Sequence, residues 1–197
     1  MLVQRGIARK LKEALVAHIE QVYSSSVGDP KTSVLGPLVS HAHRAKVESY
    51  VALAVKEGGT IMCGGCRPKH FEHGSALQNG AFYMPTVIDG LSYTSRTAME
   101  EIFGPVITIH EFDTEEQAIV MANAVEYGLT ASVWTRDARK AQRVARQLET
   151  GTVWINTFLY FAHGQAFGGR KSSGVGRKGG RHSIDFYTEV KPIVSKL

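Results

Sequence analysis

The sequence predicts an α/β fold, with a largely parallel sheet flanked by helices and an extended C-terminal segment. Short runs of β-branched residues alternate along the chain with longer stretches in which apolar residues recur every three or four positions. Glycines follow several of these longer stretches, as is typical of helix ends. The 197 residues, of which 43% are hydrophobic, can bury one sizeable core. Strands that alternate with helices in this way form parallel sheets covered by helices.

The first part of the chain contains two predicted helices and a strand. Residues 5–23 are predicted as an amphipathic helix with apolar residues at helical spacing, namely Ile7, Leu11, Leu15, Ile19 and Val22. A loop is expected at Gly28-Asp29-Pro30, and Ser40 is expected to cap a second helix. The apolar face of this second helix carries Val47, Val51 and Ala54. Gly58-Gly59 ends the helix, and a short strand is expected over residues 60–63.

A second cycle of strands and helices follows. Residues 106–110 are β-branched and are predicted as one strand. Further strands are predicted over residues 131–134 and 152–156. The helices between them are expected to begin near Asp113 and Asp137, because acidic residues favour helix N-termini.

The end of the chain has a different pattern. Residues 186–194 read as extended, and no helix is expected after them. Pro192 favours an edge strand, since proline cannot donate to a sheet ladder. Such a strand can pair with another subunit or with the chain's own sheet, and periodicity does not decide between them. The predicted domains are residues 1–180 and residues 181–197.

Charge and hydropathy exclude several classes of protein. The net charge is +5, and much of it gathers late in the chain, at Arg170, Lys171, Arg177, Lys178 and Arg181. Aromatic residues are not interleaved with these cations, so we expect a solvated turn and no nucleic-acid partner. No apolar run approaches the length of a membrane span, and the first residues lack the zones of a signal peptide. A cytoplasmic protein without a membrane partner is expected.

The two cysteines form a Cys-Gly-Gly-Cys sequence, Cys63 to Cys66. This spacing is compatible with a redox pair or with half of a zinc site. His70 and His73 follow at a loose spacing, and no second cysteine pair completes a zinc site. We therefore expect a strand that ends in a glycine turn, with no metal.

An acidic pair and an aromatic residue precede one of the predicted strands, in Glu100-Glu101-Ile102-Phe103-Gly104-Pro105-Val106. The Gly-Pro turn places carboxylate and ring chemistry beside an apolar strand, where ligand sites often lie in α/β folds. This segment resembles the nicotinamide-ribose segment of the aldehyde dehydrogenases. Further segments resemble that family in content and order, namely residues 35–40, 82–87, 127–129, 151–156, 167–177 and 187–191.

The resemblance implies an aldehyde oxidation that depends on NAD or NADP, and it implies roles for particular residues. Glu101 matches the glutamate that accepts hydrogen bonds from the nicotinamide ribose, and Phe103 matches an aromatic residue at the nicotinamide end. Lys46 resembles a lysine near the same ribose, whereas the polar residue expected three positions earlier is replaced by His43. Phe161 and Phe167 resemble aromatic residues of the aldehyde tunnel. For Phe161, ordinary core packing is the alternative.

The catalytic residues of the family have no match in these 197 residues. The resemblance implies a cysteine nucleophile in a Gly-Gln-x-Cys motif that would precede Leu2-Val3-Gln4, together with a general base and a dinucleotide-binding half. We therefore expect the C-terminal part of an aldehyde dehydrogenase, with no catalytic residue and no activity alone. The resemblance implies that residues 1–180 are a partial catalytic domain and that residues 181–197 are an oligomerisation strand. A truncated product, a piece of a split gene or a misassigned start would each give this sequence.

The expected partners follow from the same resemblance. They are a small-molecule aldehyde and either further copies of the chain or an intact or N-terminal aldehyde dehydrogenase chain. A non-catalytic oligomerisation module is the alternative function. The segment 177–189 most resembles members that act on muconic semialdehydes, but residues 158–165 are more apolar than in those members and contain no arginine. A hydrophobic or aromatic aldehyde is therefore predicted as the substrate.

Overall fold

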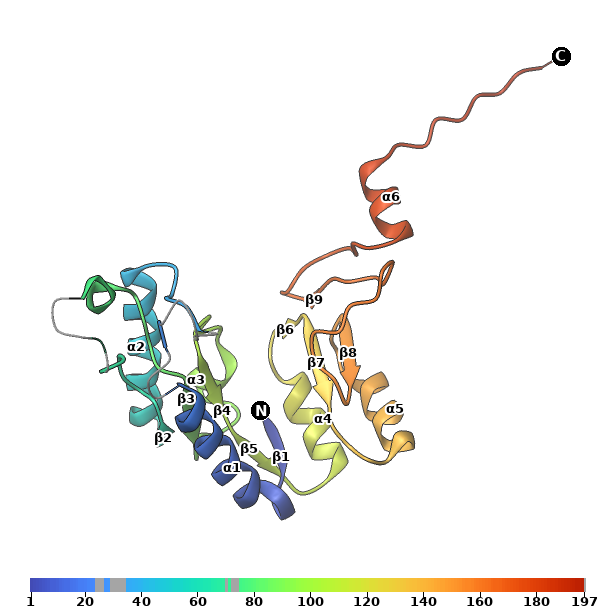
Figure 1. The fold of residues 1–197 in the computed structure, drawn as a ribbon. Coiled ribbons are helices and arrows are strands. Elements are labelled where there is room, and N and C mark those ends of the chain that lie inside the picture. Colours follow the sequence, from blue (N-terminus) through green and yellow to red (C-terminus); the bar gives the residue numbers. More distant parts are fainter. Residues whose placement is uncertain (24–26, 29–34, 70, 72–74, 197) are drawn as a thin grey trace. The chain divides into compact units, whose positions relative to one another are not determined.

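The computed structural model describes residues 1–23, 27–28, 35–69, 71 and 75–196 (Figure 1). The chain divides into two compact units, Met1–Met121 and Ala122–Leu197. The boundary expected after residue 180 falls inside the second unit, and the division into residues 1–180 and 181–197 stays a prediction. Among the described residues, no helix is both long enough and apolar enough to cross a membrane.

The first unit is an α/β structure with parallel and antiparallel pairing. Strand β3 is paired parallel with β4 and antiparallel with β2, while β1 is paired parallel with β5. The elements in order are β1 (Leu2–Gln4), α1 (Arg5–Tyr23), α2 (His41–Lys56), β2 (Thr60–Cys63), the 3₁₀ helix η1 (Ala76–Asn79), β3 (Thr86–Asp89), α3 (Arg96–Met99), β4 (Val106–Thr108), β5 (His110–Phe112) and α4 (Glu115–Asn123), which continues into the second unit.

Local sequence signals account for the helix bounds in this unit. Helix α1 covers the predicted residues 5–23. The predicted cap of α2 is confirmed, because the Ser40 hydroxyl accepts a hydrogen bond from the His43 amide at 3.0 Å. The loop expected at Gly28-Asp29-Pro30 falls largely outside the described residues, since Asp29 and Pro30 are not among them.

The single strand predicted over residues 106–110 is wrong, because the structure divides it into β4 and β5. Strand β4 is paired with β3, whereas β5 is paired with β1. Ile109 lies between them, 1% exposed, and its amide donates to the Ile88 carbonyl at 2.9 Å. The chain thus changes partners at this residue, which a run of β-branched residues does not reveal.

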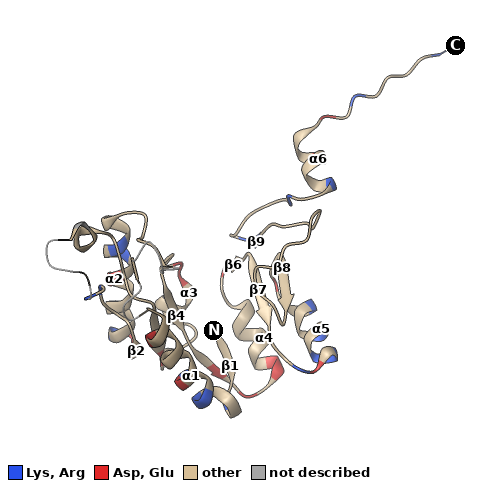
Figure 2. Cartoon of the chain, in the orientation of Figure 1, with Lys and Arg blue, Asp and Glu red and all other residues tan. Residues whose placement is uncertain are grey.

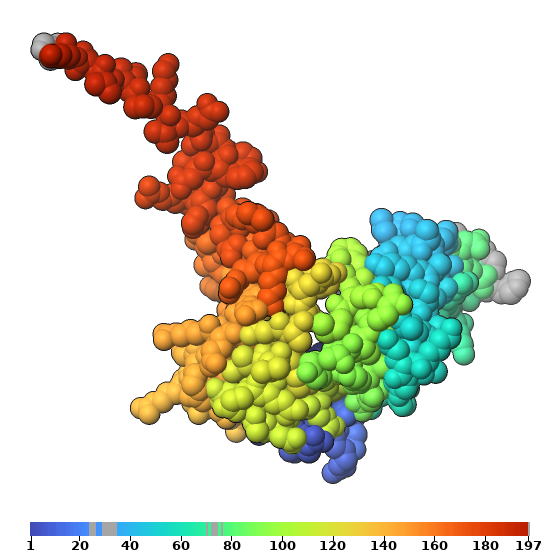
Figure 3. Space-filling model, turned by 180° about the vertical axis from the view of Figure 1, so that it is seen from behind, coloured from blue at the N-terminus to red at the C-terminus, as the bar shows by residue number. Residues whose placement is uncertain are grey.

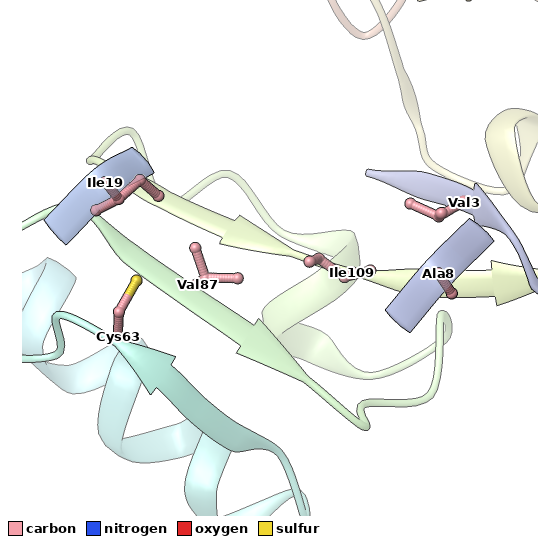
Figure 4. Close-up of a cluster of buried hydrophobic side chains, with 6 residues drawn as sticks. All are labelled: Val3, Ala8, Ile19, Cys63, Val87 and Ile109. Atoms are coloured by element: carbon pink, nitrogen blue, oxygen red, sulfur yellow. The ribbon is translucent and has the colours of Figure 1, made fainter. Parts of the chain in front are cut away.

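Strand β3 is buried on both faces. Its neighbours Val87 and Ile88 point to opposite faces, as successive strand residues do, and both are 0% exposed. One face packs in a cluster with α1, formed by Val3, Ala8, Ile19, Cys63, Val87 and Ile109 (Figure 4). On the other face Ile88 packs with Ala54 of α2 and with Leu91. The sheet is therefore covered by helices on both sides, as predicted.

A network of ion pairs ties α1 to the strands. The Lys12 ammonium donates to Asp89 at 2.6 Å and to Glu111 at 2.7 Å, and its side chain is only 11% exposed. Desolvation opposes the charge of Lys12, but the hydrogen bonds to the two carboxylates outweigh it and raise the pKa of Lys12. Arg5 extends the network to Glu111 and Asp113.

The second unit contains the predicted strand–helix–strand order. Strands β7 and β8 are parallel, and β6 and β9 are antiparallel. The elements are β6 (Tyr127–Gly128), β7 (Thr130–Val133), α5 (Ala138–Gln147), β8 (Thr152–Ile155), β9 (Arg170–Lys171) and α6 (Arg181–Tyr187). Asp137 caps α5 by accepting from the Lys140 amide at 3.0 Å, as expected. Figure 2 shows the Lys and Arg positions of α5 in blue. Their side chains are exposed, while Ala141 of the same helix is buried.

The extended pattern predicted over residues 186–194 is wrong at its start. Phe186 and Tyr187 belong to helix α6, and the Thr188 hydroxyl donates to the Ile184 carbonyl at the end of that helix. Residues 188–196 have no regular secondary structure and, within the described part of the chain, pair with no strand. Pairing of this segment with another subunit stays a prediction.

We expect Ile88→Ala to lower the free energy of unfolding by about 2–5 kcal/mol, because it leaves a cavity between the sheet and α2. Urea unfolding followed by circular dichroism measures this. Ile7→Ala is the matched control, since Ile7 is 55% exposed and its truncation costs less than about 0.5 kcal/mol. Equal losses in both variants would contradict the assigned core.

Candidate functional site

The acidic motif lies in a loop between α3 and β4, and α2 runs beside this loop. Figure 3 shows the segment around residues 95–105, in light green, against the blue-to-cyan surface of α2. Ile102 packs into the cluster of Val47, Val51 and Tyr83. A Cβ on Gly104 would approach Val47 to 2.6 Å, so only glycine allows the loop to lie this close to α2.

Three side chains of α2 hold the loop by hydrogen bonds. His43 Nε2 donates to the Phe103 carbonyl at 2.6 Å. Lys46 Nζ donates to the Glu101 carbonyl at 2.9 Å, and the Tyr50 hydroxyl donates to the Glu100 carboxylate at 2.6 Å. Their spacing of three and four residues places them on one face of the helix. The loop is therefore held at three successive places along α2, twice through its backbone and once through the Glu100 carboxylate.

The two carboxylates of the acidic pair have different surroundings. Glu100 accepts from Tyr50 and, through both oxygens, from the Arg96 guanidinium at 2.7 and 3.0 Å. The hydrogen bonds from Arg96 and then Tyr50 lower the pKa of Glu100 to about 2. Glu101 is exposed, and its carboxylate makes no hydrogen bond or ion pair with the described residues. Only Glu101 thus presents a carboxylate that is ready to accept from a ligand.

Phe103 is held in an unusual conformation. Its φ is +59°, which is uncommon for a bulky residue, and the side chain is 74% exposed. The rings of His43 and Phe103 lie edge to face, with centroids 6.0 Å apart. Ile102 points inward between the two exposed residues, so Glu101 and Phe103 face solvent from one short segment.

The predicted substrate residues belong to an aromatic cluster of the second unit. The rings of Phe161 and Phe167 lie edge to face at 5.3 Å, and Phe161 also contacts Trp154 at 5.4 Å. Trp154 is buried, and its Nε1 donates to the Tyr160 carbonyl at 2.8 Å. Phe161 is 51% exposed, so one side of this cluster is open.

The structure therefore brings the predicted residues together in two groups. Lys46, Glu101 and Phe103 form one group in the first unit, and Phe161 and Phe167 form the other in the second. Tyr50 and Trp154 were not predicted from the sequence. Tyr50 lies four residues after Lys46, and this helical spacing is the signal by which it could have been found.

The cysteines occupy the strand end and the turn that were predicted for them. Both are free thiols. Cys63 lies in the core with 9% of its surface exposed, and burial raises the pKa of its thiol. A buried thiol with a raised pKa is a poor nucleophile. His70 and His73 lie outside the described residues, and the described ones contain no group of three or more His, Cys, Asp or Glu residues suited to a metal.

The first unit is thus an α/β structure in which the loop before β4 presents an exposed carboxylate and an exposed ring. The chain belongs to the aldehyde dehydrogenase family, whose model matches residues 1–193. It is 44% identical over 195 residues to 2-hydroxymuconic semialdehyde dehydrogenase of Pseudomonas putida, covering 99% of this chain and 39% of the relative. It is 42% identical over 198 residues to 2-aminomuconic semialdehyde dehydrogenase of Mus musculus, covering 100% of this chain and 40% of the relative.

The fold also matches solved structures of this family. Betaine aldehyde dehydrogenase from Staphylococcus aureus, solved in complex with NAD+, superposes with a TM-score of 0.86 at 41% identity. The match covers 94% of this chain and 36% of that one. The chain thus spans about 40% of the length of the curated relatives it matches.

We expect the Glu100 carboxylate to make the free energy of unfolding fall at acidic pH. Its pKa lies near 2 in the folded chain against an ordinary value of 4.5, so its contribution is fully present above pH 4.5 and is lost as the pH falls toward 2. Glu100→Gln should therefore lower the urea midpoint at pH 7 and flatten its fall between pH 5 and pH 3. Glu101→Gln is the adjacent control and should keep the wild-type dependence of the urea midpoint on pH. The same dependence in Glu100→Gln as in wild type would contradict the role given to Glu100.

Proposed function

We propose that this chain supplies the nicotinamide-ribose contact and part of the aldehyde pocket of an NAD(P)-dependent aldehyde dehydrogenase. The observation that carries the proposal is the exposed Glu101 carboxylate, which has no partner among the described residues and lies on a loop that α2 fixes. A carboxylate only accepts hydrogen bonds, which suits the two hydroxyls of a ribose. The NAD+ complexes among the matched solved structures support NAD as the cofactor, while NADP remains the alternative.

The residues that fit this cofactor have separate roles. Glu101 accepts from the ribose hydroxyls, and Phe103 limits where the nicotinamide end can lie. Lys46 acts through the Glu101 carbonyl, to which it donates, and so orients the Glu101 backbone. When bound, the nicotinamide supplies the hydride acceptor that converts an aldehyde to a carboxylic acid.

The chemistry requires a nucleophile from outside these 197 residues. Aldehyde oxidation of this type needs a thiolate to attack the carbonyl. Burial raises the pKa of the Cys63 thiol. Cys66 lies in the turn after β2, far from Glu101 in the sequence, and no described contact joins it to the loop that carries Glu101. We therefore assign no catalytic residue to this chain and expect no aldehyde oxidation by it alone.

The aromatic cluster supports a hydrophobic or aromatic aldehyde as the substrate. Phe161 and Phe167 offer apolar ring surface, and residues 158–165 contain no arginine that would pair with a carboxylated substrate. Three of the similar proteins are named for muconic semialdehydes. A muconic semialdehyde is therefore the competing substrate. The two free thiols fit the reducing conditions of the cytoplasm, where we place the protein.

We expect the purified chain to produce no NADH from NAD+ and any aldehyde of a mixed panel, and Cys63→Ser to change nothing. When it is mixed with the separately produced N-terminal part of a relative, oxidation should appear. In that mixture, Glu101→Gln should raise KM for NAD+ by about tenfold or more, because hydrogen bonds to a charged acceptor are lost.

The control for this reconstitution is Glu116→Gln, which removes an exposed carboxylate from α4 and should leave KM unchanged. Comparison of an aromatic aldehyde with a muconic semialdehyde in the same mixture tests the substrate. Turnover by the chain alone that disappears in Cys63→Ser would overturn the proposal that the nucleophile comes from another chain.

A non-catalytic assembly module is the second candidate function. The observation that favours it is the exposed apolar C-terminal segment, in which Val190, Ile193 and Val194 are 86–95% exposed. Such side chains favour burial against another chain, either a second copy or an intact aldehyde dehydrogenase.

Light scattering of the full chain should therefore report an oligomer at micromolar concentration. Removal of residues 189–197 should shift the chain toward the monomer without loss of helical content. The triple change of Val190, Ile193 and Val194 to serine should have the same effect, whereas serine at the exposed Val120 of α4 serves as the control. A monomeric full chain would exclude assembly through this segment.

A further inference from the structure

A closed set of hydrogen bonds joins α2 to the segment that leads into the acidic motif. The Glu57 carboxylate, at the end of α2, accepts from the Arg96 amide at 2.9 Å and the Thr97 amide at 3.2 Å. The Arg96 side chain then donates to Glu100 through Nε and Nη2, and Glu100 also accepts from Tyr50 of the same helix α2. The path thus leaves α2 at Glu57 and returns to it at Tyr50.

We propose that Tyr50 and Arg96 are positioning residues of the ribose site, which fix the Glu100 carboxylate so that Glu101 and Phe103 are presented outward. This inference rests on the proposed function, because it concerns the loop that we assign to the cofactor ribose. The inference gives the two carboxylates of the acidic pair different roles. Glu100 orients the loop, and Glu101 is left to the ligand.

Geometry supports the division. Glu100 and Glu101 are adjacent, so a fixed Glu100 side chain limits the directions in which the next residue can point. Lys46 holds the Glu101 carbonyl from α2 and leaves the Glu101 carboxylate free of described partners. The Lys46 ammonium also lies 5.8 Å from the centre of the Tyr50 ring, so the two helix residues support each other.

The conformation of Phe103 explains why the loop needs this support. A non-glycine residue with φ of +59° persists only where its surroundings impose that conformation. His43 fixes the Phe103 carbonyl on one side, and Glu100 anchors the loop three residues earlier. An isolated exposed ion pair contributes little, and the Arg96 side chain is 66% exposed. The Tyr50 hydrogen bond is part-buried, and the contact of Arg96 with Glu100 is bidentate. Together they hold the Glu100 carboxylate more firmly than an exposed ion pair alone would.

The test is NMR of the full chain at pH 7 without cofactor. Tyr50→Phe removes one hydroxyl and should speed exchange of the Glu100 amide, which is bonded to the Arg96 carbonyl, by about tenfold. The amide signals of Glu101 to Gly104 should shift or broaden, while those of Val87 and Ile88 in β3 stay as in the wild type. A purely structural loss of stability would instead affect all of these amides.

Matched variants sharpen the result. Glu100→Gln should speed exchange in the loop as Tyr50→Phe does, by more than its lower stability speeds exchange in β3, and Glu101→Gln should not. Arg96→Lys keeps the charge and should restore part of what Arg96→Ala loses. Tyr93→Phe removes a hydroxyl that makes no hydrogen bond within the described chain and should change nothing.

Unchanged loop signals in both Tyr50→Phe and Arg96→Ala would overturn the inference, and so would equal effects of Glu100→Gln and Glu101→Gln. An acceleration in β3 as large as in the loop would assign Tyr50 to general stability and equally overturn it. Because the exchange measurement needs no cofactor, its outcome is independent of the reconstitution that tests the proposed function.

Discussion

Burial of strand β3 on both faces is the constraint on which the rest of the first unit depends. Val87 requires a helix on one side of the sheet and Ile88 requires one on the other, and α1 and α2 supply them. Strand β4 pairs with β3, and α2 packs on one face of their sheet. The loop that enters β4 therefore lies beside α2. The position of the candidate ribose site is thus a consequence of core packing.

Features with local causes were predictable from the sequence. The caps at Ser40 and Asp137 depend on one side chain and an amide three residues away, and both form as expected. Helix α1 follows from its apolar period. In each case the interacting groups lie within a few residues of one another, so the sequence contains the whole cause.

Features that depend on distant partners were not predictable in this way. The break at Ile109 arises because β1 and β3 pair with successive segments of one apolar run. Similarly, the resemblance to the family assigns Glu101 to the ribose, but it does not distinguish the surroundings of its neighbour Glu100. Arg96 lies four residues before Glu100, but only the packing of α2 beside the loop shows that Tyr50 engages the same carboxylate, while that of Glu101 has no described partner.

The fixed loop also determines what this chain can contribute to binding. Ligand binding is weakened by the entropy lost when side chains and loops become ordered, and a loop already held in place avoids that cost. Under the proposed function, one carboxylate and one ring would contact only the nicotinamide-ribose end of a dinucleotide. A fixed loop with so few contacts would therefore contribute orientation of that end more than affinity for the whole cofactor.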